Sequence, residues 1–487
     1  MSWTRWKENK TASPFPTAED PPPHLRRTVF FRRSALACLL ALLIIALSGC
    51  QALPTTPQAT TPTAEPEVTT SPQLTETLPP NITPLIFWEP FSLDRSQGLL
   101  LGEMVRDFEA ENPDIVVEIV PKSGYVGIHG AMIAALPDGE LPDLAVAFPS
   151  MIAQYAQAGV VVPLELYLND AEVGLTDEDL AVIPPGYLEA GRIPGFGRQV
   201  LAFPFAQNAI GMWVNETLLA QAGWDHAPTT WDEFEQACFD VVAQTGVGCY
   251  PYIESVSTFT AWLYSRGGQQ LDAAGGQAVF NSPAGVESLA LLRRLIDGGL
   301  AWRPQQPYGD YVAFTNGQAA FTFSSTGNSQ LYAEAYEAAT GKGMAPFQWR
   351  QTLIPQTDPN NPATALYGGS FFILQSSQKR QRAAWRLIRW FTDRKQTARW
   401  AAELESLPVR ISALEVMTDT LEAYPFVQAQ LTEILPYARP EPTVAAELEV
   451  RDILYTAILS VTQGIADPQT ALDQAARKAN ALLAKQP

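Results

Sequence analysis

Hydrophobic residues in the first part of the folded chain alternate between a strand pattern and a helix pattern. The run Ile82–Trp88 is rich in β-branched and aromatic residues and predicts a β-strand. An amphipathic helix is predicted next, because four apolar residues follow at the i, i+3, i+4, i+7 spacing: Leu101, Met104, Val105 and Phe108. Ile115–Val120 predicts a second strand, so the segment indicates a right-handed β-α-β unit with parallel strands.

The same alternation continues through Ala145–Phe148, a predicted strand, and Met151–Ala158, a predicted helix. Repeated alternation of strand and helix is typical of α/β proteins whose sheet carries helices on both faces. Ligands of such sheets bind beyond the carboxyl ends of the strands. Four residues lie at those ends and are candidate ligand contacts: Trp88, Tyr125, Phe148 and Ser150.

Residues 198–223 contain two alternating apolar patterns with a polar interruption between them. Pro204 removes a backbone donor after the first pattern, and the amides Gln207 and Asn208 follow it. The pattern predicts a strand that stops, turns polar and restarts. Asn215 is then expected to cap a helix that ends near Gly223.

The N-terminal segment has the pattern of a secretion signal. Arginines at positions 26–33 precede the apolar run Ala35–Leu47, which is shorter than a bilayer-spanning helix. Residues 47–50, Leu-Ser-Gly-Cys, resemble the lipobox of bacterial lipoproteins, and this resemblance implies a mature chain that begins with a lipid-carrying Cys50. We therefore expect residues 1–49 to be a signal peptide, and a short transmembrane anchor is the alternative.

Residues 50–83 consist almost wholly of Pro, Thr, Ala, Gln and Glu after the cysteine. A segment with so few apolar residues cannot form a core, and we expect a tether between the lipid and the folded chain.

The charge of the chain limits its partners. Residues 1–49 hold seven basic and three acidic residues, which leaves 25 basic and 48 acidic residues after them and a net charge of −23. Nucleic acids and anionic lipid surfaces both need a basic footprint, so neither is an expected partner.

Two cysteines remain once Cys38 is removed with the leader and Cys50 carries lipid. These are Cys238 and Cys249. In an oxidising compartment we expect a disulfide between them, and two unpaired buried thiols are the alternative.

The sequence contains few of the residues and motifs that catalytic sites require. Its three histidines are His24, His129 and His226, and it has no HExxH motif, no Cys/His cluster and no GxSxG nucleophile elbow. We expect no catalytic residues, no metal and no cofactor. Chance pairs among 48 acidic residues leave glycoside hydrolysis by paired carboxylates open as an alternative.

Several motifs occur in one order along residues 84–485. They are F-x-x-x-N-P-D-I-x-V-E from Phe108, P-x-T-W-x-E-F from Pro228, F-x-x-G-x-x-A-F from Phe314, L-P-V from Leu407 and D-P-x-x-A-L-x-x-A from Asp467. In this order they resemble the family 1 extracellular solute-binding proteins of ABC importers.

The resemblance implies an α/β fold of the type II periplasmic-binding-protein kind. Two lobes, each a mixed sheet flanked by helices, would enclose a ligand cleft, with lobe 1 formed by residues 84–205 and 326–375 and lobe 2 by residues 206–325 and 376–487. It further implies a monomer, held at the outer face of the cell membrane by lipid on Cys50, that delivers its solute to an ABC permease.

A cleft that binds sugars needs flat aromatic faces and a few fixed polar groups. The candidate stacking residues are Trp88, Tyr125, Tyr252, Trp262 and Tyr367. The candidate polar contacts are Gln207, Asn208, Ser324 and Arg410, and Gly369 allows a close backbone approach to the ligand. Core packing is the alternative for each aromatic residue, and a structural ion pair is the alternative for Arg410.

The kind of ligand is a further expectation. Gly124-Tyr125 and the helix after them resemble the glycerol-3-phosphate-binding branch of the family, but Phe148-Pro149 stands where that branch usually has a carboxylate. We therefore expect a neutral saccharide first, and glycerol-3-phosphate or a phosphodiester second.

Overall fold

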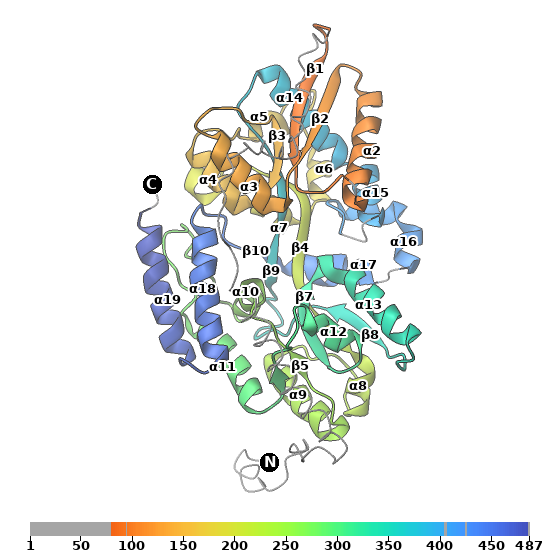
Figure 1. Cartoon of the computed structure of the whole chain (residues 1–487), viewed down its shortest axis with the longest axis vertical. Helices are drawn as coiled ribbons and strands as arrows, with labels where there is room; N and C mark the ends of the chain where they lie inside the picture. The colour runs from red at the N-terminus through yellow and green to blue at the C-terminus, as the bar shows by residue number, and fades with distance from the viewer. Residues whose placement is uncertain (1–78, 94, 404–406, 424–425, 486–487) are drawn as a thin grey trace, which may run out of the picture. The chain divides into compact units, whose positions relative to one another are not determined.

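One continuous mixed sheet organises the folded part of the chain. The computed structural model describes residues 79–93, 95–403, 407–423 and 426–485, all within the compact unit formed by residues 78–487. The sheet follows the order β2-β1-β3-β9-β4-β7, while β10 pairs with β9 and β8 pairs with β4 (Figure 1). The expected signal peptide, the lipidated cysteine and most of the tether lie outside the described residues.

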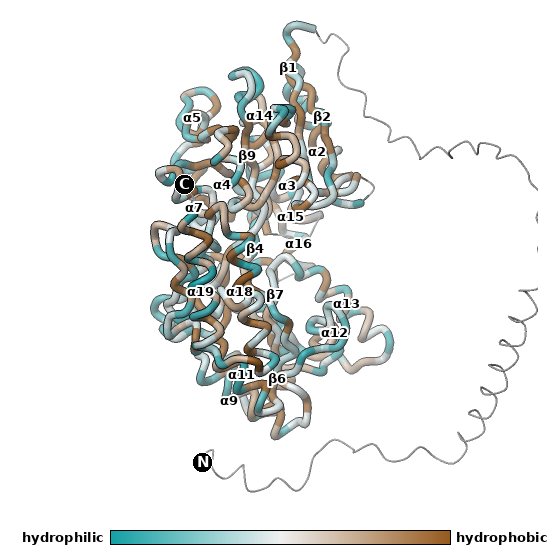
Figure 2. Tube along the Cα trace, turned by 60° about the vertical axis from the view of Figure 1, so that its left-hand side comes forward, coloured by the Kyte–Doolittle hydropathy of each residue, from teal (hydrophilic) through white to brown (hydrophobic). Residues whose placement is uncertain are grey.

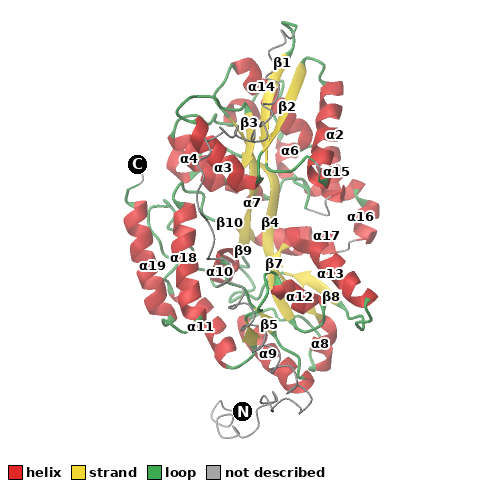
Figure 3. Cartoon of the chain, in the orientation of Figure 1, coloured by secondary structure: helices red, strands yellow, loops and turns green. Residues whose placement is uncertain are grey.

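The strands of this sheet are β1 (Thr83–Glu89), β2 (Ile115–Pro121), β3 (Leu144–Ala147), β4 (Phe203–Asn215), β7 (Phe321–Ser325), β8 (Trp349–Thr352), β9 (Thr364–Ile373) and β10 (Ala438–Pro440), and a separate pair is formed by β5 (Tyr250–Pro251) and β6 (Ala301–Trp302). The strands β1, β2 and β3 are parallel, whereas β9 is antiparallel to both β3 and β4 (Figure 3). The expected β-α-β unit is thus present.

The α-helices in the described part of the chain are α2 (Ser96–Glu111), α3 (Gly124–Ala135), α4 (Pro149–Gln157), α5 (Glu165–Leu168), α6 (Asp177–Ala181), α7 (Pro185–Ala190), α8 (Glu216–Gln221), α9 (Trp231–Thr245), α10 (Val256–Tyr264), α11 (Pro283–Asp297), α12 (Gly309–Thr315), α13 (Ser329–Gly341), α14 (Gln378–Phe391), α15 (Arg394–Glu403), α16 (Thr418–Ala423), α17 (Phe426–Ala429), α18 (Glu447–Thr462) and α19 (Pro468–Leu483). Hydrophobic and hydrophilic residues alternate along many of them, as amphipathic helices require (Figure 2). No helix in the part of the chain that the structure describes is long and apolar enough to cross a membrane.

β4 differs from the expected strand that stops and restarts. It is one strand of 13 residues, with a shift in its register to β9 between Pro204 and Ala206. The shift accommodates the missing N–H of the proline, and the backbones of Gln207 and Asn208 remain paired with Gly368 and Tyr367. Polar side chains did not end the strand because the ladder uses only backbone groups. Asn215 caps the following helix as expected, accepting from the Leu218 N–H at 3.0 Å.

Two large hydrophobic cores define the lobes. The first-lobe core contains residues of β1, α2, β2 and the first half of β4, with Phe87, Phe108, Phe203 and Phe371 among its buried members. The second-lobe core contains Phe234, Trp262, Phe323, Leu454 and Leu472 among others. β4 contributes Phe203 to the first core and Ile210 to the second, so the two cores share one strand.

The two cores divide the chain differently from the expected lobe boundaries at two places. After β7 the chain does not return to lobe 1 near residue 326. Instead Tyr332 of α13 stacks on Trp213, the two ring centroids being 4.8 Å apart, and β8 pairs with residues 212–215 of β4. The return occurs along β9, where Ala365 belongs to the second core and Phe371 to the first.

The second difference concerns residues 376–440, which the expected boundaries place in lobe 2. The apolar stripe of α14, including Trp385 and Ile388, packs into the first-lobe core, and Ala438 is the last member of that core. The third crossing therefore lies between Ala438 and Ala446, which belongs to the second core. The motif at 314–321 ends at Phe321, the first residue of β7, and it carries no information about which core the helices after this strand enter.

The side chain of Arg410, a candidate ligand contact, forms its hydrogen bonds within the first lobe. The side chain is 4% exposed; Nε donates to the Thr392 carbonyl at 2.5 Å, and Nη1 donates to the Asp179 carbonyl at 3.0 Å and to Asp179 Oδ1 at 2.9 Å. These bonds favour the alternative role, a structural ion pair, over a ligand contact.

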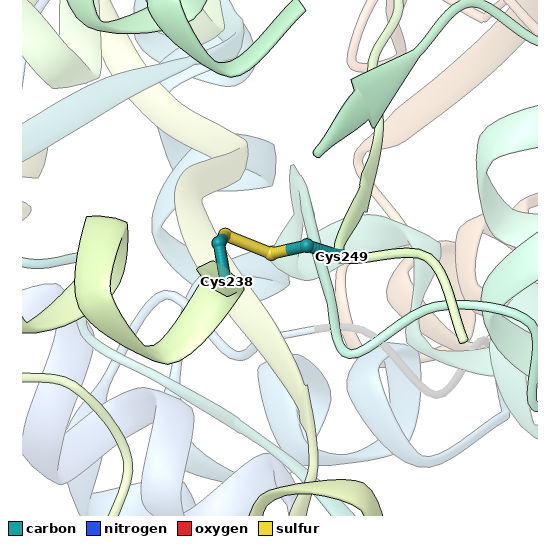
Figure 4. The surroundings of a disulfide bond; sticks show 2 residues. All are labelled: Cys238 and Cys249. Carbon is teal, nitrogen blue, oxygen red and sulfur yellow. A yellow bond between two sulfur atoms is a disulfide. The ribbon is translucent and has the colours of Figure 1, made fainter. Parts of the chain in front are cut away.

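Cys238 of α9 and Cys249, next to β5, are bonded in the structure, with an S–S distance of 1.95 Å (Figure 4). Both residues are fully buried in the second-lobe core.

Replacing both cysteines with alanine is expected to lower the free energy of unfolding by about 2–3 kcal/mol, because the unfolded chain regains the entropy of a short loop. Urea unfolding without reductant measures the difference. As a control, a reductant should lower the midpoint of the natural sequence and leave that of the double variant unchanged. Equal midpoints for the two proteins under oxidising conditions would contradict the bond.

Arg410→Ala is expected to cost about 2–3 kcal/mol of unfolding free energy, because it leaves buried carbonyl groups without donors. The matched control is Arg394→Ala, since Arg394 pairs with Glu415 at 2.8 Å with both side chains more than half exposed; about 1 kcal/mol or less is expected there. Similar midpoints for the two variants in urea would refute the structural role of Arg410.

Candidate functional site

The carboxyl ends of β1 and β3 point to the place where β9 leaves the first lobe. Ala147 at the end of β3 pairs with Ser370, and β9 reaches Gly369, Gly368 and Tyr367 on the second-lobe side of that pair. β4 runs beside the same segment. This crossing brings most of the candidate residues together.

Tyr125 and Phe148 form the aromatic part of the site. Their ring centroids lie 4.5 Å apart. Tyr125 lies directly against Gly369, because a Cβ atom on that glycine would be 2.3 Å from the Tyr125 hydroxyl. Glycine at 369 is therefore needed for the tyrosine to reach the strand. Ser150 lies in the first turn of α4, two residues after Phe148.

Gln207 supports this aromatic pair from β4. Its Nε2 donates to the Gly369 carbonyl and to Ser370 Oγ, each at 3.0 Å. Its Oε1 is buried and has no hydrogen-bond partner among the described residues. A buried amide oxygen without a donor is costly, so a ligand that brings a donor would satisfy it.

Trp88 and Glu89 end β1. The Lys122 ammonium lies 4.0 Å from the centre of the Trp88 ring. Glu89 is fully buried; its Oε2 accepts from the Phe91 N–H at 2.6 Å, while its Oε1 has no partner within the described chain. Burial raises the pKa of Glu89 to about 7, and the bond from Phe91 only partly offsets this. Sequence analysis missed Glu89, although a carboxylate at the end of a strand is a signal for a site.

Asn208 and Tyr367 lie opposite each other on β4 and β9. Gly327 follows β7, and a Cβ there would be 2.6 Å from Asn208 Oδ1, so the amide lies over this turn. Ser324 Oγ is nearby and accepts from Asn328 Nδ2 at 2.8 Å. Desolvation raises the pKa of Tyr367 to about 12. These groups belong to the second-lobe side of the crossing.

Two further candidates lie inside the second-lobe core. Trp262 is 3% exposed, and its ring centroids lie 4.6 Å from Trp231 and 5.0 Å from Phe323. Tyr252 is 5% exposed and belongs to the same core. Core packing, the alternative given above for each aromatic residue, describes the positions of both.

A cavity of about 240 Å³ lies at the third crossing. It is lined by Glu189 at the end of α7 and Arg192 after it, by Tyr264 and the segment that follows, and by the crossing chain from Arg439 to Val444. Glu441 lines it, and Glu447, also missed by sequence analysis, lies close by at the start of α18.

Within the described residues there is no group of three or more His, Cys, Asp or Glu side chains arranged to hold a metal. The His129 ring nitrogen Nδ1 lies 2.8 Å from the Tyr155 hydroxyl, and His226 Nδ1 lies 2.7 Å from Asp225 Oδ1.

Known proteins share this architecture. The family model of the bacterial extracellular solute-binding proteins matches residues 103–429. A binding protein of Brucella abortus is 25% identical over 399 residues, 80% of this chain and 90% of that protein. The sn-glycerol-3-phosphate-binding periplasmic protein UgpB of Escherichia coli is 22% identical over 420 residues, 82% of this chain and 93% of UgpB.

A solved structure agrees with these matches. The crystal structure of the cyclic alpha-maltosyl-1,6-maltose binding protein of Arthrobacter globiformis is 25% identical to this chain, with a TM-score of 0.68, and covers 82% of this chain and 99% of that protein. The expected type II fold is confirmed. Since the family model matches more than half of its length, the chain belongs to the bacterial extracellular solute-binding proteins that serve ABC importers.

Proposed function

We propose that this protein is the lipid-anchored solute-binding component of an ABC importer and that it captures a carbohydrate at the crossing of β4 and β9. The observation that carries the proposal is the aromatic pair Tyr125–Phe148, which lies beside the buried amide of Gln207. An aromatic face stacks on the apolar face of a sugar ring, and an unpartnered amide oxygen accepts from a hydroxyl. Cys50 would carry the lipid at the outer face of the membrane.

Capture by closure follows from the position of the site. A ligand shifts a two-state equilibrium only if it binds one state more tightly than the other. Tyr125 and Trp88 belong to the first lobe, whereas Asn208, Ser324 and Tyr367 lie on the second-lobe side of the crossing. A solute that contacts both sets favours the closed form, which would then dock on the permease and deliver the solute.

Glycerol-3-phosphate or a phosphodiester is the second candidate, and the proposal for it rests on Lys122. Its ammonium lies beside Trp88, and desolvation lowers its pKa, so an anion would regain favourable interactions there. The relative UgpB, named for sn-glycerol-3-phosphate, is consistent with this candidate. Glycoside hydrolysis has less support, since the family consists of solute-binding proteins.

A thermal-shift screen of the mature chain tests the carbohydrate proposal. We expect mono- or oligosaccharides to raise the melting temperature in a concentration-dependent way, since a ligand that binds only the folded state stabilises it. Stabilisation by glycerol-3-phosphate and not by any sugar would select the second candidate. Stabilisation only by amino acids, peptides or metals would reject both.

Tyr125→Ala is expected to weaken sugar binding about 2- to 13-fold, the loss of one aromatic stacking contact. Tyr125→Phe is the matched control and should retain most of the affinity, because the ring remains. Trp262→Ala should instead lower the unfolding free energy by about 3–5 kcal/mol through a core cavity. Titration calorimetry and urea unfolding separate the two effects; unchanged affinity in Tyr125→Ala would remove the aromatic pair from the site.

A further inference from the structure

Glu447 is a buried carboxyl group without a hydrogen bond. The residue is 2% exposed, and neither Oε1 nor Oε2 has a partner among the described residues. It begins α18, at the third crossing between the lobes. A carboxyl group in this situation carries a large desolvation cost, which a natural structure retains only where something else satisfies it.

Glu441 lies close to Glu447 and shares its environment. Its Oε2 bonds to Nη1 of Arg451, whose Nη2 donates to Ser257 Oγ at 3.0 Å. Its Oε1 has no partner in the described chain. The carboxylate of Glu441 raises the pKa of Glu447, although burial is the larger cause, and Arg451 acts in the opposite direction. Two carboxyl groups thus share one arginine.

Three further arginines line the cavity: Arg192, Arg198 and Arg439. In the described part of the chain none of them forms an ion pair with either glutamate, since Arg198 pairs with Glu189 and Arg192 Nη1 donates to the Arg198 carbonyl at 3.3 Å. The Tyr264 hydroxyl donates to the Pro440 carbonyl at 3.0 Å, and both glutamates raise its pKa. Arg439 lowers the pKa of Tyr264. Arg439 is itself exposed, and its guanidinium donates to Asn361 Oδ1 at 3.0 Å. With both glutamates ionised, the cluster has one uncompensated negative charge.

The pair adjoins both the cavity and the proposed solute site. Glu441 and Tyr264 line the cavity of about 240 Å³. Desolvation is the largest cause that raises the pKa of Tyr367; of the nearby charges, Glu441 raises this pKa and Arg451 lowers it. Tyr367 lies opposite Asn208 in the β4–β9 ladder. The Glu441 N–H donates to the Leu366 carbonyl at 2.9 Å, so Glu441 lies beside the residue that precedes Tyr367, on the second-lobe side of the crossing.

The three unpartnered oxygens match the donors of a primary ammonium group. Glu447 offers Oε1 and Oε2, and Glu441 offers Oε1. A protonated amine carries three N–H donors and one positive charge. A hard metal ion is a poorer match, because calcium takes six to eight oxygen ligands. A phosphate is disfavoured, since it would bring negative charge to an acidic pair.

We propose that Glu441 and Glu447 recognise a protonated amine of the solute, so that the carbohydrate is an amino sugar. This proposal rests on the proposed function, since it names the kind of carbohydrate that the same protein captures. Burial favours the protonated form of Glu447, whereas an ammonium beside it favours the ionised form. Binding forms an ion pair and is therefore expected to release protons to the solvent.

Titration calorimetry on the mature chain tests the proposal with matched sugars: glucosamine, galactosamine and mannosamine, each beside its parent hexose and its N-acetyl form. We expect at least one amino sugar to bind about 10- to 100-fold more tightly than its two neutral counterparts, the range for hydrogen bonds to charged groups. Repeating the titration in two buffers of different ionisation enthalpy should reveal release of up to one proton per amino sugar bound.

Glu447→Gln keeps the shape of the side chain and should abolish both the preference and the proton release while neutral sugars still bind. Glu449→Gln is the control, because Glu449 lies two residues along the same helix and is exposed. Should Glu447→Gln fail to fold, Glu441→Gln and the proton count of the unmodified chain decide instead. Neutral sugars that bind as tightly as amino sugars would overturn this inference and leave the proposed function standing, whereas no binding of any sugar would reject both.

Discussion

The antiparallel pairing of β4 with β9 is the constraint on which the rest of the structure depends. Both strands pass from one hydrophobic core to the other, so neither core is complete without them. The middle of the paired segment lies close to neighbouring backbone and side chains, and in β9 two glycines occupy it. Gly368 and Gly369 leave no room for a side chain next to Gln207 and Tyr125, respectively. Gln207, Asn208 and Tyr367 are therefore held by a backbone ladder rather than by loops, which is how precise positioning is obtained in proteins.

The proposed solute site and the neighbouring pair Glu441 and Glu447 are rich in buried acceptors that lack donors among the described residues. Glu89 Oε1, Gln207 Oε1, Glu441 Oε1 and both oxygens of Glu447 have no partner in the described part of the chain. Unpaired buried oxygens lower the stability of a fold, and functional sites are where such costs persist. Because these groups accept rather than donate, they suit a ligand with many O–H or N–H donors. The same chemistry makes an anionic ligand less suitable, apart from the neighbourhood of Lys122.

Charge also explains why α14 belongs to the first lobe. Its apolar stripe packs into that core, and its arginines bind first-lobe carboxylates, with Arg380 at 2.6 Å from Asp143, Arg382 at 2.8 Å from Asp170 and Arg386 at 2.7 Å from Asp114. The pairs of Arg382 and Arg386 are partly exposed and contribute little by themselves, whereas Asp143 is buried. Together they fix the direction in which the helix crosses the sheet. This leaves β4, β9 and the segment from Ala438 to Ala446 as the crossings about which closure would occur.

The sequence by itself determined the alternation of strands and helices, the Asn215 cap and the family, since these depend on the apolar period and on residue types within a few positions of one another. It also left only one pair of cysteines for a disulfide. Tertiary structure alone decided which core α13 and α14 enter, why Tyr125 faces the crossing while Trp262 is buried in a core, and why Arg410 bonds to Asp179. It also placed Glu447, an ordinary residue in the sequence, in a buried position next to Glu441. Such outcomes depend on which surfaces pack together between residues far apart in the chain. A local pattern of hydrophobic and polar residues does not determine that packing.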